Sequence, residues 1–254
     1  MSSHVCPLHV AVDTNTGKSY GTEKPVGKAI RESGVPRSQL FVTTKLWNNV
    51  HHPDDVGKSL QKSLDELGLD YVDLFLMHWP VAWKRGDDPF PKDAQGNFAL
   101  DNTDWLEVCA FYHHLGENSR WIDRHLTFSQ TWRAMEKLPS TSKARAIGVS
   151  NFNKAEMERL VQNASVQPAV HQFEGHPWLQ QRDFAEWHKA KGIHVTHYSP
   201  FGNQNELYSR SGHIGRLIDD PVLVEIGKKH NKNSAQVALG KLAHIFPPFL
   251  EVFC

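Results

Sequence analysis

The strongest constraint on the fold of this 254-residue chain is a repeated alternation of short apolar runs and amphipathic helical segments. The runs at 40–45 and 71–78 are rich in β-branched and aromatic residues, which is typical of buried strands. Between them, residues 52–67 carry apolar side chains every three or four positions, and Gly68 follows as a helix stop. A shorter helix is predicted over 25–33.

The same alternation returns in the second half of the chain. We predict further strands over 144–149, 169–173 and 193–198, and further helices over 154–162, 182–191, 221–229 and 234–239. Strands separated by helices pair in parallel, so the predicted fold class is α/β. A TIM-type (β/α)8 barrel is the leading architecture and a doubly wound sheet is the alternative. No GxGxxG motif follows a predicted strand, which disfavours a Rossmann domain.

Composition narrows the class of protein. The 28 Lys and Arg residues balance 28 Asp and Glu residues, whereas nucleic-acid binders usually carry a basic excess, so no nucleic-acid partner is expected. No apolar run is long enough for a membrane span, and the first residues lack the pattern of a signal peptide. The three cysteines, Cys6, Cys109 and Cys254, are far apart, which suits a reducing compartment. We therefore expect a cytoplasmic protein without a membrane partner.

Several polar residues lie where predicted strands end, and in a barrel these positions face the active site. Lys45 and His78 close two hydrophobic strands, where a buried charge is costly unless it is paired or functional. The other strand-end candidates are Ser150, Asn151, Gln172, Glu174 and Tyr198. The ordinary alternative is that each of these residues simply meets solvent.

Other chemistries find little support in the sequence. Among 16 histidines, the pairs His51-His52 and His113-His114 are adjacent and point apart, and no HExxH motif occurs, so no metal site is predicted. Hydrolase and kinase functions are disfavoured, because the chain has neither a GxSxG motif nor a P-loop.

Six segments together resemble the aldo-keto reductase family, and they occur in the family's order. They are YGTEKPVGKAI (20–30), FVTTKLW (41–47), LDYVDLFLMHWP (69–80), AIGVSNFN (146–153), HQFEGHPWLQQ (171–181) and GIHVTHYSPFG (192–202). The resemblance implies a (β/α)8 barrel that binds NADP(H) without a Rossmann domain. It also implies a monomer that transfers a hydride from the cofactor to a carbonyl carbon.

The resemblance assigns roles to individual residues. Tyr20 would be the general acid, Lys45 would lower the pKa of its phenol, and His78 would orient the carbonyl. Asp13 is the candidate for the family's catalytic aspartate, although it lies seven residues before Tyr20, a longer spacing than in the family.

The resemblance also assigns the cofactor and substrate contacts. Ser150, Asn151 and Gln172 would hold the carboxamide of the nicotinamide, and Tyr198 would stack on its ring. Ser199, Phe201 and Asn203 would lie near the pyrophosphate. Trp47, Trp79 and His78 would line the substrate pocket.

The chain is predicted to be a single aldo-keto reductase-like domain over 1–254, family-like at 20–106 and 131–240. Residues 1–19, 107–130 and 241–254 depart from the family pattern, so the chain resembles a member truncated at both ends with an internal insertion. The first and last strands of the barrel are not recognisable, which predicts an incomplete barrel. Genuine segments and unspliced introns are both open explanations, since Gly240-Lys241 can be encoded by a splice-donor sequence.

The functional expectation is an oxidoreductase that reduces an aldehyde or ketone with NADPH. The main alternative is a catalytically impaired homologue that only binds, and a metal-dependent barrel hydrolase is a weaker one. The small-molecule carbonyl substrate is not identified, so an aldose, glyceraldehyde, a steroid-like ketone and an intermediate of secondary metabolism all stay open.

Overall fold

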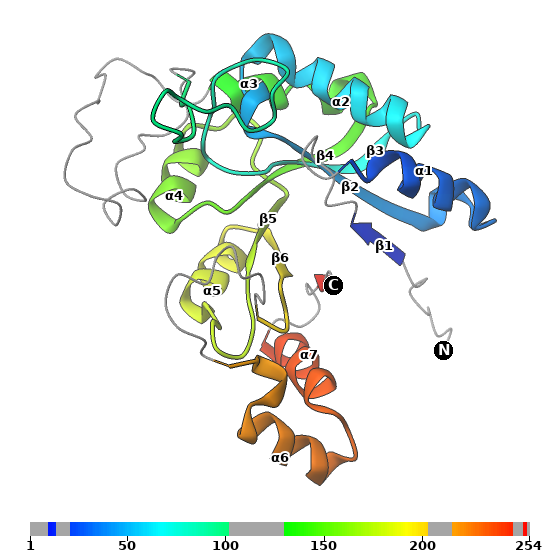
Figure 1. Ribbon diagram of the computed structural model, residues 1–254, viewed down its shortest axis with the longest axis vertical. Helices are drawn as coiled ribbons and strands as arrows, with labels where there is room; N and C mark the ends of the chain where they lie inside the picture. Colours follow the sequence, from blue (N-terminus) through cyan, green and yellow to red (C-terminus); the bar gives the residue numbers. More distant parts are fainter. Residues whose placement is uncertain (1–9, 14–20, 102–129, 203–214, 246–250, 253–254) are drawn as a thin grey trace. The chain divides into compact units, whose positions relative to one another are not determined.

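The computed structural model describes residues 10–13, 21–101, 130–202, 215–245 and 251–252. The chain divides into two compact units, residues 1–169 and 170–254. Each unit is built from parallel strands with helices between them (Figure 1). The single domain over 1–254 stays a prediction.

The first unit contains a parallel sheet in the order β1-β2-β3-β4. Its strands are β1 (Val10–Asp13), β2 (Leu40–Leu46), β3 (Val72–Met77) and β4 (Ala144–Ser150). Its helices are α1 (Glu23–Glu32), α2 (Pro53–Leu67), α3 (Gln130–Met135) and α4 (Lys154–Asn163). Helices α1 and α2 pack side by side (Figure 1). The strands predicted over 40–45, 71–78 and 144–149 are confirmed to within one or two residues.

Strand register separates the two faces of this sheet. Lys45 of β2 lies opposite Leu76 of β3, which lies opposite Gly148 of β4, so these three residues share one face. The neighbouring Thr44 points to the other face, where its hydroxyl donates to Glu23 Oε1 of α1 at 2.8 Å. Helix α1 therefore covers the face away from Lys45.

Helix α2 begins and ends as its sequence predicts. Pro53 stands in its first turn, where an N–H would have no helical partner, and the ring of His52 accepts from the N–H of Asp54. Gly68 adopts a left-handed conformation at φ 67° and its N–H donates to Leu64 O, which closes the helix. The buried face contains the predicted apolar residues Val56, Leu60, Leu64 and Leu67, together with Ser63.

An ion-pair network ties the strands at the end of the sheet away from Lys45. The buried carboxylate of Asp73 accepts from Arg37 Nη2 at 2.7 Å, from the Val42 N–H at 2.9 Å and from Arg145 Nη1 at 3.0 Å. Both guanidinium groups lie over the ring of Tyr71, at 4.0 and 4.2 Å from its centre. This network joins β2, β3 and β4.

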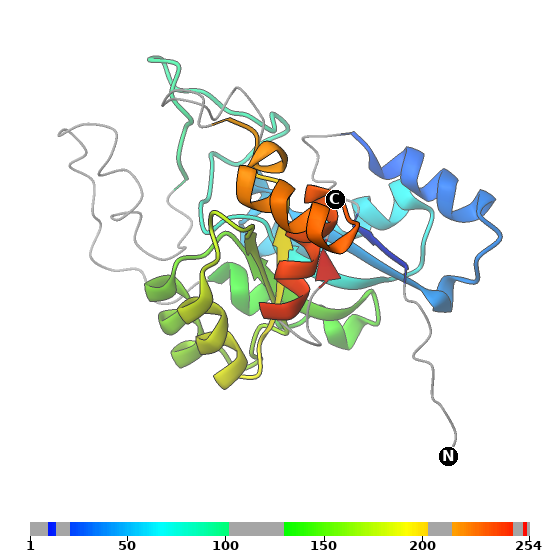
Figure 2. The same ribbon diagram turned by 90° about the horizontal axis from the view of Figure 1, so that it is seen from below.

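The second unit holds the parallel strands β5 (Val170–Glu174), β6 (His194–Tyr198) and β7 (Glu251–Val252). Its helices are α5 (Arg182–Ala190), α6 (Pro221–His230) and α7 (Ser234–Ile245). Helices α6 and α7 pack against each other (Figure 2). Their shared core contains Leu217, Leu223 and Ala238.

Some elements differ from the sequence predictions. Helix α7 continues through Gly240 to Ile245 rather than ending at Leu239, because Leu242 beyond the glycine is fully buried and no proline occurs before Pro247. No strand is recognisable from the sequence in 1–19 or 241–254, yet the structure forms the short strands β1 and β7 there. Helix α3 was also missed, since six residues are too few for a periodic signal.

Candidate active site

Lys45 lies near the end of β2, and its side chain is only 2% exposed. The strand is hydrophobic because both of its faces are covered, so the ammonium group must be held by polar neighbours. This is the arrangement predicted for a functional lysine at a strand end.

His78 follows β3 directly and is also buried. Its N–H donates to Leu46 O at 3.1 Å, which extends the β2–β3 ladder by one step. Since Lys45 lies opposite Leu76 and side chains alternate along a strand, His78 falls on the same face as Lys45. Lys45 and His78, both predicted from their positions at strand ends, therefore lie on the same face of the sheet.

Burial and the positive charge of Lys45 together lower the pKa of His78 well below 6.5, with a smaller contribution from His51. The imidazole is therefore neutral at pH 7 and can donate one hydrogen bond while accepting another. Its Nδ1 has no hydrogen-bond partner among the residues that the structure describes.

Two tryptophans surround the imidazole of His78. The edge of the Trp47 ring meets it with the ring centres 4.9 Å apart, and the half-buried Trp79 lies nearly parallel to it at 6.3 Å. These are the two tryptophans predicted to line a substrate pocket. They give the surroundings of His78 an apolar, aromatic character.

Ser150 and Asn151 end β4 beside this position. Gly148 lies opposite Leu76, so Ser150 shares the face of His78, and it is fully buried. Asn151 has a left-handed backbone with φ 64°, and its Nδ2 donates to His78 O at 2.9 Å and to Ser150 Oγ at 3.1 Å. Asn151 thereby fastens the end of β4 to the backbone of His78.

Four predicted cofactor residues that the structure describes belong to the second unit. Gln172 of β5 is 2% exposed, and its buried Nε2 has no partner within the described ranges. Tyr198 ends β6, and Ser199 follows with φ 52° in a turn closed by Gly202 N–H on Ser199 O. Phe201 packs against the core of α6 and α7.

Asp13, Tyr20 and Asn203 are the remaining predicted site residues. Asp13 is the last residue of β1 and lies opposite Thr43 in the ladder, at the same end of the sheet as Lys45. Tyr20 and Asn203 lie outside the described residues.

Sequence reasoning missed the segment that follows β3. Its Trp83 and Phe90 meet the ring of Trp47 edge-on, at 5.4 and 5.8 Å between centres. His51 was also not assigned a role; burial lowers its pKa from 6.5 to about 3. The available signal was a cluster of aromatic residues after a strand, which has no period and so predicts no contact.

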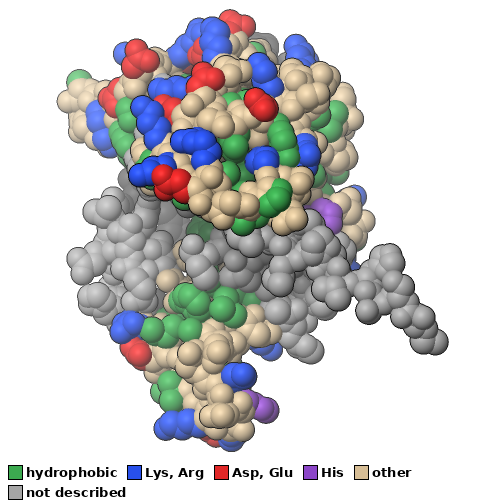
Figure 3. Space-filling model, turned by 90° about the vertical axis from the view of Figure 1, so that its right-hand side faces the viewer, with side chains coloured by type: hydrophobic (Ala, Val, Ile, Leu, Met, Phe, Trp, Pro, Cys, Tyr) green, Lys and Arg blue, Asp and Glu red, His purple; other side chains and the backbone are tan. Residues whose placement is uncertain are grey.

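In the described residues, no three His, Cys, Asp or Glu side chains gather as a metal ion would require. No helix in those ranges is long and apolar enough to cross a membrane. Acidic and basic side chains are interspersed over the upper part of the face seen in Figure 3.

The chain is similar in sequence to several known proteins. It is 46% identical over 209 residues to an uncharacterised oxidoreductase of Schizosaccharomyces pombe, covering 82% of this chain and 57% of that protein. It is 40% identical to mouse aldo-keto reductase family 1 member A1 over 225 residues, covering 87% and 62%. The chain therefore spans about three fifths of the length of these curated relatives.

Solved structures give the same relationship. An aldose reductase from Schistosoma japonicum matches with a TM-score of 0.74 and 30% identity, covering 92% of this chain and 67% of that one. An aldose reductase from Giardia lamblia matches with a TM-score of 0.77 and 29% identity, covering 97% and 73%. These matches and the parallel strands with intervening helices confirm the predicted α/β fold class of TIM type, in an incomplete form. The model of the aldo/keto reductase family matches residues 13–240, and the chain belongs to this family.

Proposed function

We propose that the protein is an oxidoreductase that reduces an aldehyde or a ketone to an alcohol with NADPH. Membership of the aldo/keto reductase family supports carbonyl reduction with a nicotinamide cofactor. The observation that carries the proposal is the pairing of a buried lysine with a neutral, buried histidine on one face of the sheet.

In this proposal His78 orients the substrate. A neutral imidazole donates a hydrogen bond from one ring nitrogen, and a carbonyl oxygen is the natural acceptor. The donor polarises the carbonyl without giving up its own proton, because burial and Lys45 disfavour the charged ring. Trp47 and Trp79 beside it favour a hydrophobic carbonyl compound over a highly polar one.

Tyr20 is the proposed proton donor. A phenol has a pKa near 10 in water, so it transfers its proton slowly at pH 7 unless a neighbouring cation lowers that value. Lys45 is the proposed cation, and Asp13, at the same end of the sheet, is proposed to balance its charge. The proton from Tyr20 would go to the oxygen of the former carbonyl.

The residues fit a nicotinamide group. The buried Nε2 of Gln172 lacks a partner within the described ranges and can donate to a carboxamide oxygen. Ser150 and Asn151 are proposed to complete the carboxamide contacts, Tyr198 to stack on the ring, and Ser199, Phe201 and Asn203 to lie near the pyrophosphate. Bound NADPH would supply the hydride that is added to the carbonyl carbon.

The direct test follows NADPH consumption by the purified chain with a panel of carbonyl compounds. We expect turnover with at least one aromatic aldehyde, and a lower KM for NADPH than for NADH. Quenching of protein fluorescence by NADPH measures binding independently. Binding without turnover of any carbonyl would instead support the impaired, non-catalytic homologue.

Three variants separate the proposed roles. Tyr20→Phe and Lys45→Met should lower kcat by about a hundredfold or more, because each removes part of the proton transfer. His78→Gln should mainly raise KM for the carbonyl. The exposed His230 provides a matched control, and His230→Gln should leave all constants unchanged. Full activity of Tyr20→Phe would refute the assigned acid.

The other expectations from the sequence also stay proposals. They are a monomeric state, a cytoplasmic location and a substrate from secondary metabolism. Gel filtration, localisation of a tagged chain and metabolite profiling after deletion address them in turn.

A further inference from the structure

The segment that follows β3 folds into a hairpin, residues 81–101, here called the aromatic loop. Antiparallel bridges join Trp83 to Leu100 and Lys92 to Phe98. The Lys84 N–H donates to Ala99 O at 2.8 Å, which closes the hairpin between its two arms. The loop is thus a hydrogen-bonded unit of its own.

Its aromatic side chains extend the surface around His78. Trp83 stacks on Phe98 with ring centres 4.2 Å apart and planes within 5°. Trp83 and Phe90 both meet the ring of Trp47, which in turn touches His78. Phe90 is 41% exposed, so its ring is still open to a ligand. The position of the loop therefore determines the apolar surface next to the proposed carbonyl site.

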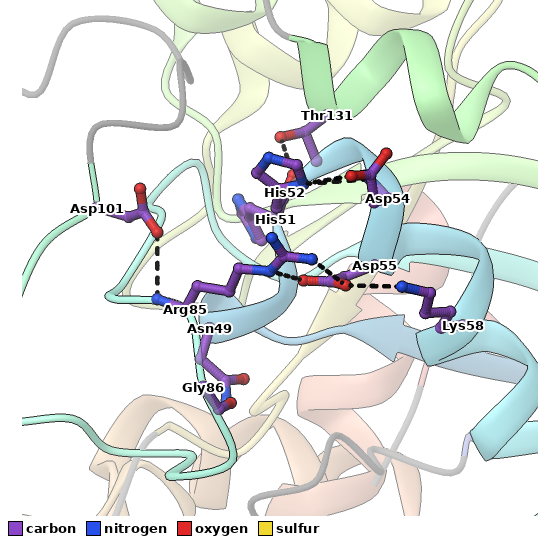
Figure 4. Close-up of polar contacts among 10 residues, drawn as sticks. All are labelled: Asn49, His51, His52, Asp54, Asp55, Lys58, Arg85, Gly86, Asp101 and Thr131. Atoms are coloured by element: carbon purple, nitrogen blue, oxygen red, sulfur yellow. Dashed lines mark hydrogen bonds and ion pairs between the residues drawn. The ribbon is translucent and has the colours of Figure 1, made fainter.

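Three attachments hold the aromatic loop to the residues after β2, in helix η2 (Asn48–Val50) and Trp47. The indole N–H of Trp47 donates to Pro89 O at 2.8 Å. The backbone N–H of Trp83 donates to Asn48 O at 2.9 Å. The third attachment is the side chain of Asn49. Its Nδ2 donates to Gly86 O at 2.7 Å (Figure 4) and also to Asp88 O at 2.9 Å.

Asn49 differs from the other attachments because its single buried amide group donates to carbonyl oxygens at both ends of the turn, Gly86 and Asp88. Its side chain is 1% exposed, and each of its two amide hydrogens has one carbonyl acceptor. Hydrogen bonds whose donor is buried, as here, fix a loop more strongly than fully exposed ones, because water replaces them less easily. Pro89 and Phe90 directly follow the turn that Asn49 holds.

A fourth attachment lies at the surface. Arg85 donates from Nε and Nη2 to the carboxylate of Asp55 in α2. The backbone N–H of Arg85 donates to Asp101 Oδ2 (Figure 4). The guanidinium lowers the pKa of Asp55 below its usual value. The side chain of Arg85 is 46% exposed, so solvent weakens this pair.

We propose that Asn49 is a positioning residue for substrate selectivity. It fixes the aromatic loop so that Phe90 stays against Trp47, and it thereby favours planar aromatic carbonyl compounds over small aliphatic ones. The selectivity part of this inference rests on the proposed carbonyl reduction. The positioning part rests on the contacts alone.

The first experiment compares an aromatic and a small substrate. In Asn49→Ala, KM for 4-nitrobenzaldehyde should rise about tenfold with little change in kcat, while kcat/KM for propanal should change less than about twofold. Asn49→Ser retains one hydrogen-bond donor, so its KM for 4-nitrobenzaldehyde should lie between those of the unmodified protein and Asn49→Ala. Asp55→Asn removes the ion pair of the exposed attachment and serves as the matched control, with the ratio of the two substrates unchanged to within about twofold.

The second experiment does not depend on activity. Lys84, Arg85 and Lys92 are exposed trypsin sites in the aromatic loop. Limited digestion of folded Asn49→Ala should cleave after Lys92 about tenfold faster than digestion of the unmodified protein, because the freed loop opens more often. Asp55→Asn should change this rate far less.

The outcomes separate the two proposals. Faster cleavage with no turnover by any protein, including the unmodified one, would support the positioning role and overturn the proposed function. Normal turnover with unchanged selectivity and unchanged cleavage would overturn the role of Asn49. If neither Asn49 variant folds, slow cleavage after Lys92 in the unmodified protein supports a fixed loop, and cleavage as fast as in urea-unfolded chain refutes it.

Discussion

Acid should destabilise the second unit through a cluster of buried histidines. His188 Nδ1 donates to Phe184 O at 2.6 Å, so in the neutral ring its Nε2 is the acceptor. His171 Nδ1 must then donate to that Nε2, across 2.7 Å. His197 Nδ1 donates to Phe173 O at 3.2 Å. All three rings are fully buried, so a second proton on any of them places a charge in an apolar site.

The magnitude follows from the lowered pKa values. Burial lowers the pKa of His188 and of His197 from 6.5 to about 4 in each case, and burial with the neighbouring His188 lowers that of His171 well below 6.5. Because these folded values lie below the unfolded one, the stabilisation is complete above pH 6.5 and is lost as the pH falls towards 4. At pH 5 the loss is about 2 kcal/mol for each of His188 and His197. About 4 kcal/mol together is a large part of a typical domain's 5–15 kcal/mol.

Urea unfolding at pH 7.5, 6 and 5, followed by far-ultraviolet circular dichroism, measures this loss. His188→Phe should be less stable at pH 7.5, because His171 loses its acceptor, yet its stability should fall about 2 kcal/mol less between pH 7.5 and 5. His230→Gln, at the exposed end of α6, should leave the pH dependence unchanged. A free energy of unfolding that stays constant to within about 0.5 kcal/mol from pH 7.5 to 5 would refute the reasoning.

Three further predictions concern stability, measured by the same urea unfolding. Gly27→Ala should destabilise by about 1–3 kcal/mol, because its Cβ would lie 2.0 Å from Leu67 O, and an unchanged midpoint would contradict that packing. Gly57→Ala, in α2 with no atom within 4 Å of the new Cβ, should instead stabilise by about 0.5–1 kcal/mol, and a loss of stability would count against the helix there. Asp73→Asn should cost about 3 kcal/mol, whereas Arg145→Ala, whose side chain is 59% exposed, should cost less than about 1 kcal/mol; equal effects would argue against the buried network.

Much of the fold could be predicted from the sequence where a period exists. The apolar residues of α2 recur at helical spacing because a single stripe of that helix is buried, and Gly68 ends it through a left-handed backbone. Strands β2 and β3 are readable because they are buried on both faces and so appear as continuous apolar runs. Strand β7, with two residues, is too short to carry a period.

The candidate site was predictable only in part. The strand-end rule identified Lys45 and His78, because alternation along paired strands brings them to one face. The aromatic loop was not predictable, since the contacts of Trp83 and Phe90 with Trp47 depend on tertiary packing of a segment without periodicity. The role of Asn49 was not predictable for the same reason, because the sequence does not indicate which backbone carbonyls a buried amide will donate to.

The distribution of the proposed site residues links the acid prediction to function. Lys45 and His78 belong to the first unit, whereas Gln172 and Tyr198, proposed to contact the nicotinamide, belong to the unit that holds the histidine cluster. His171 and His197 are the neighbours in sequence of Gln172 and Tyr198, in β5 and β6. Protonation that breaks the cluster therefore acts on the same strands that carry the proposed cofactor contacts. NADPH binding should weaken over the pH range in which the second unit loses stability, and in His188→Phe this range should shift to lower pH if the cluster is the cause.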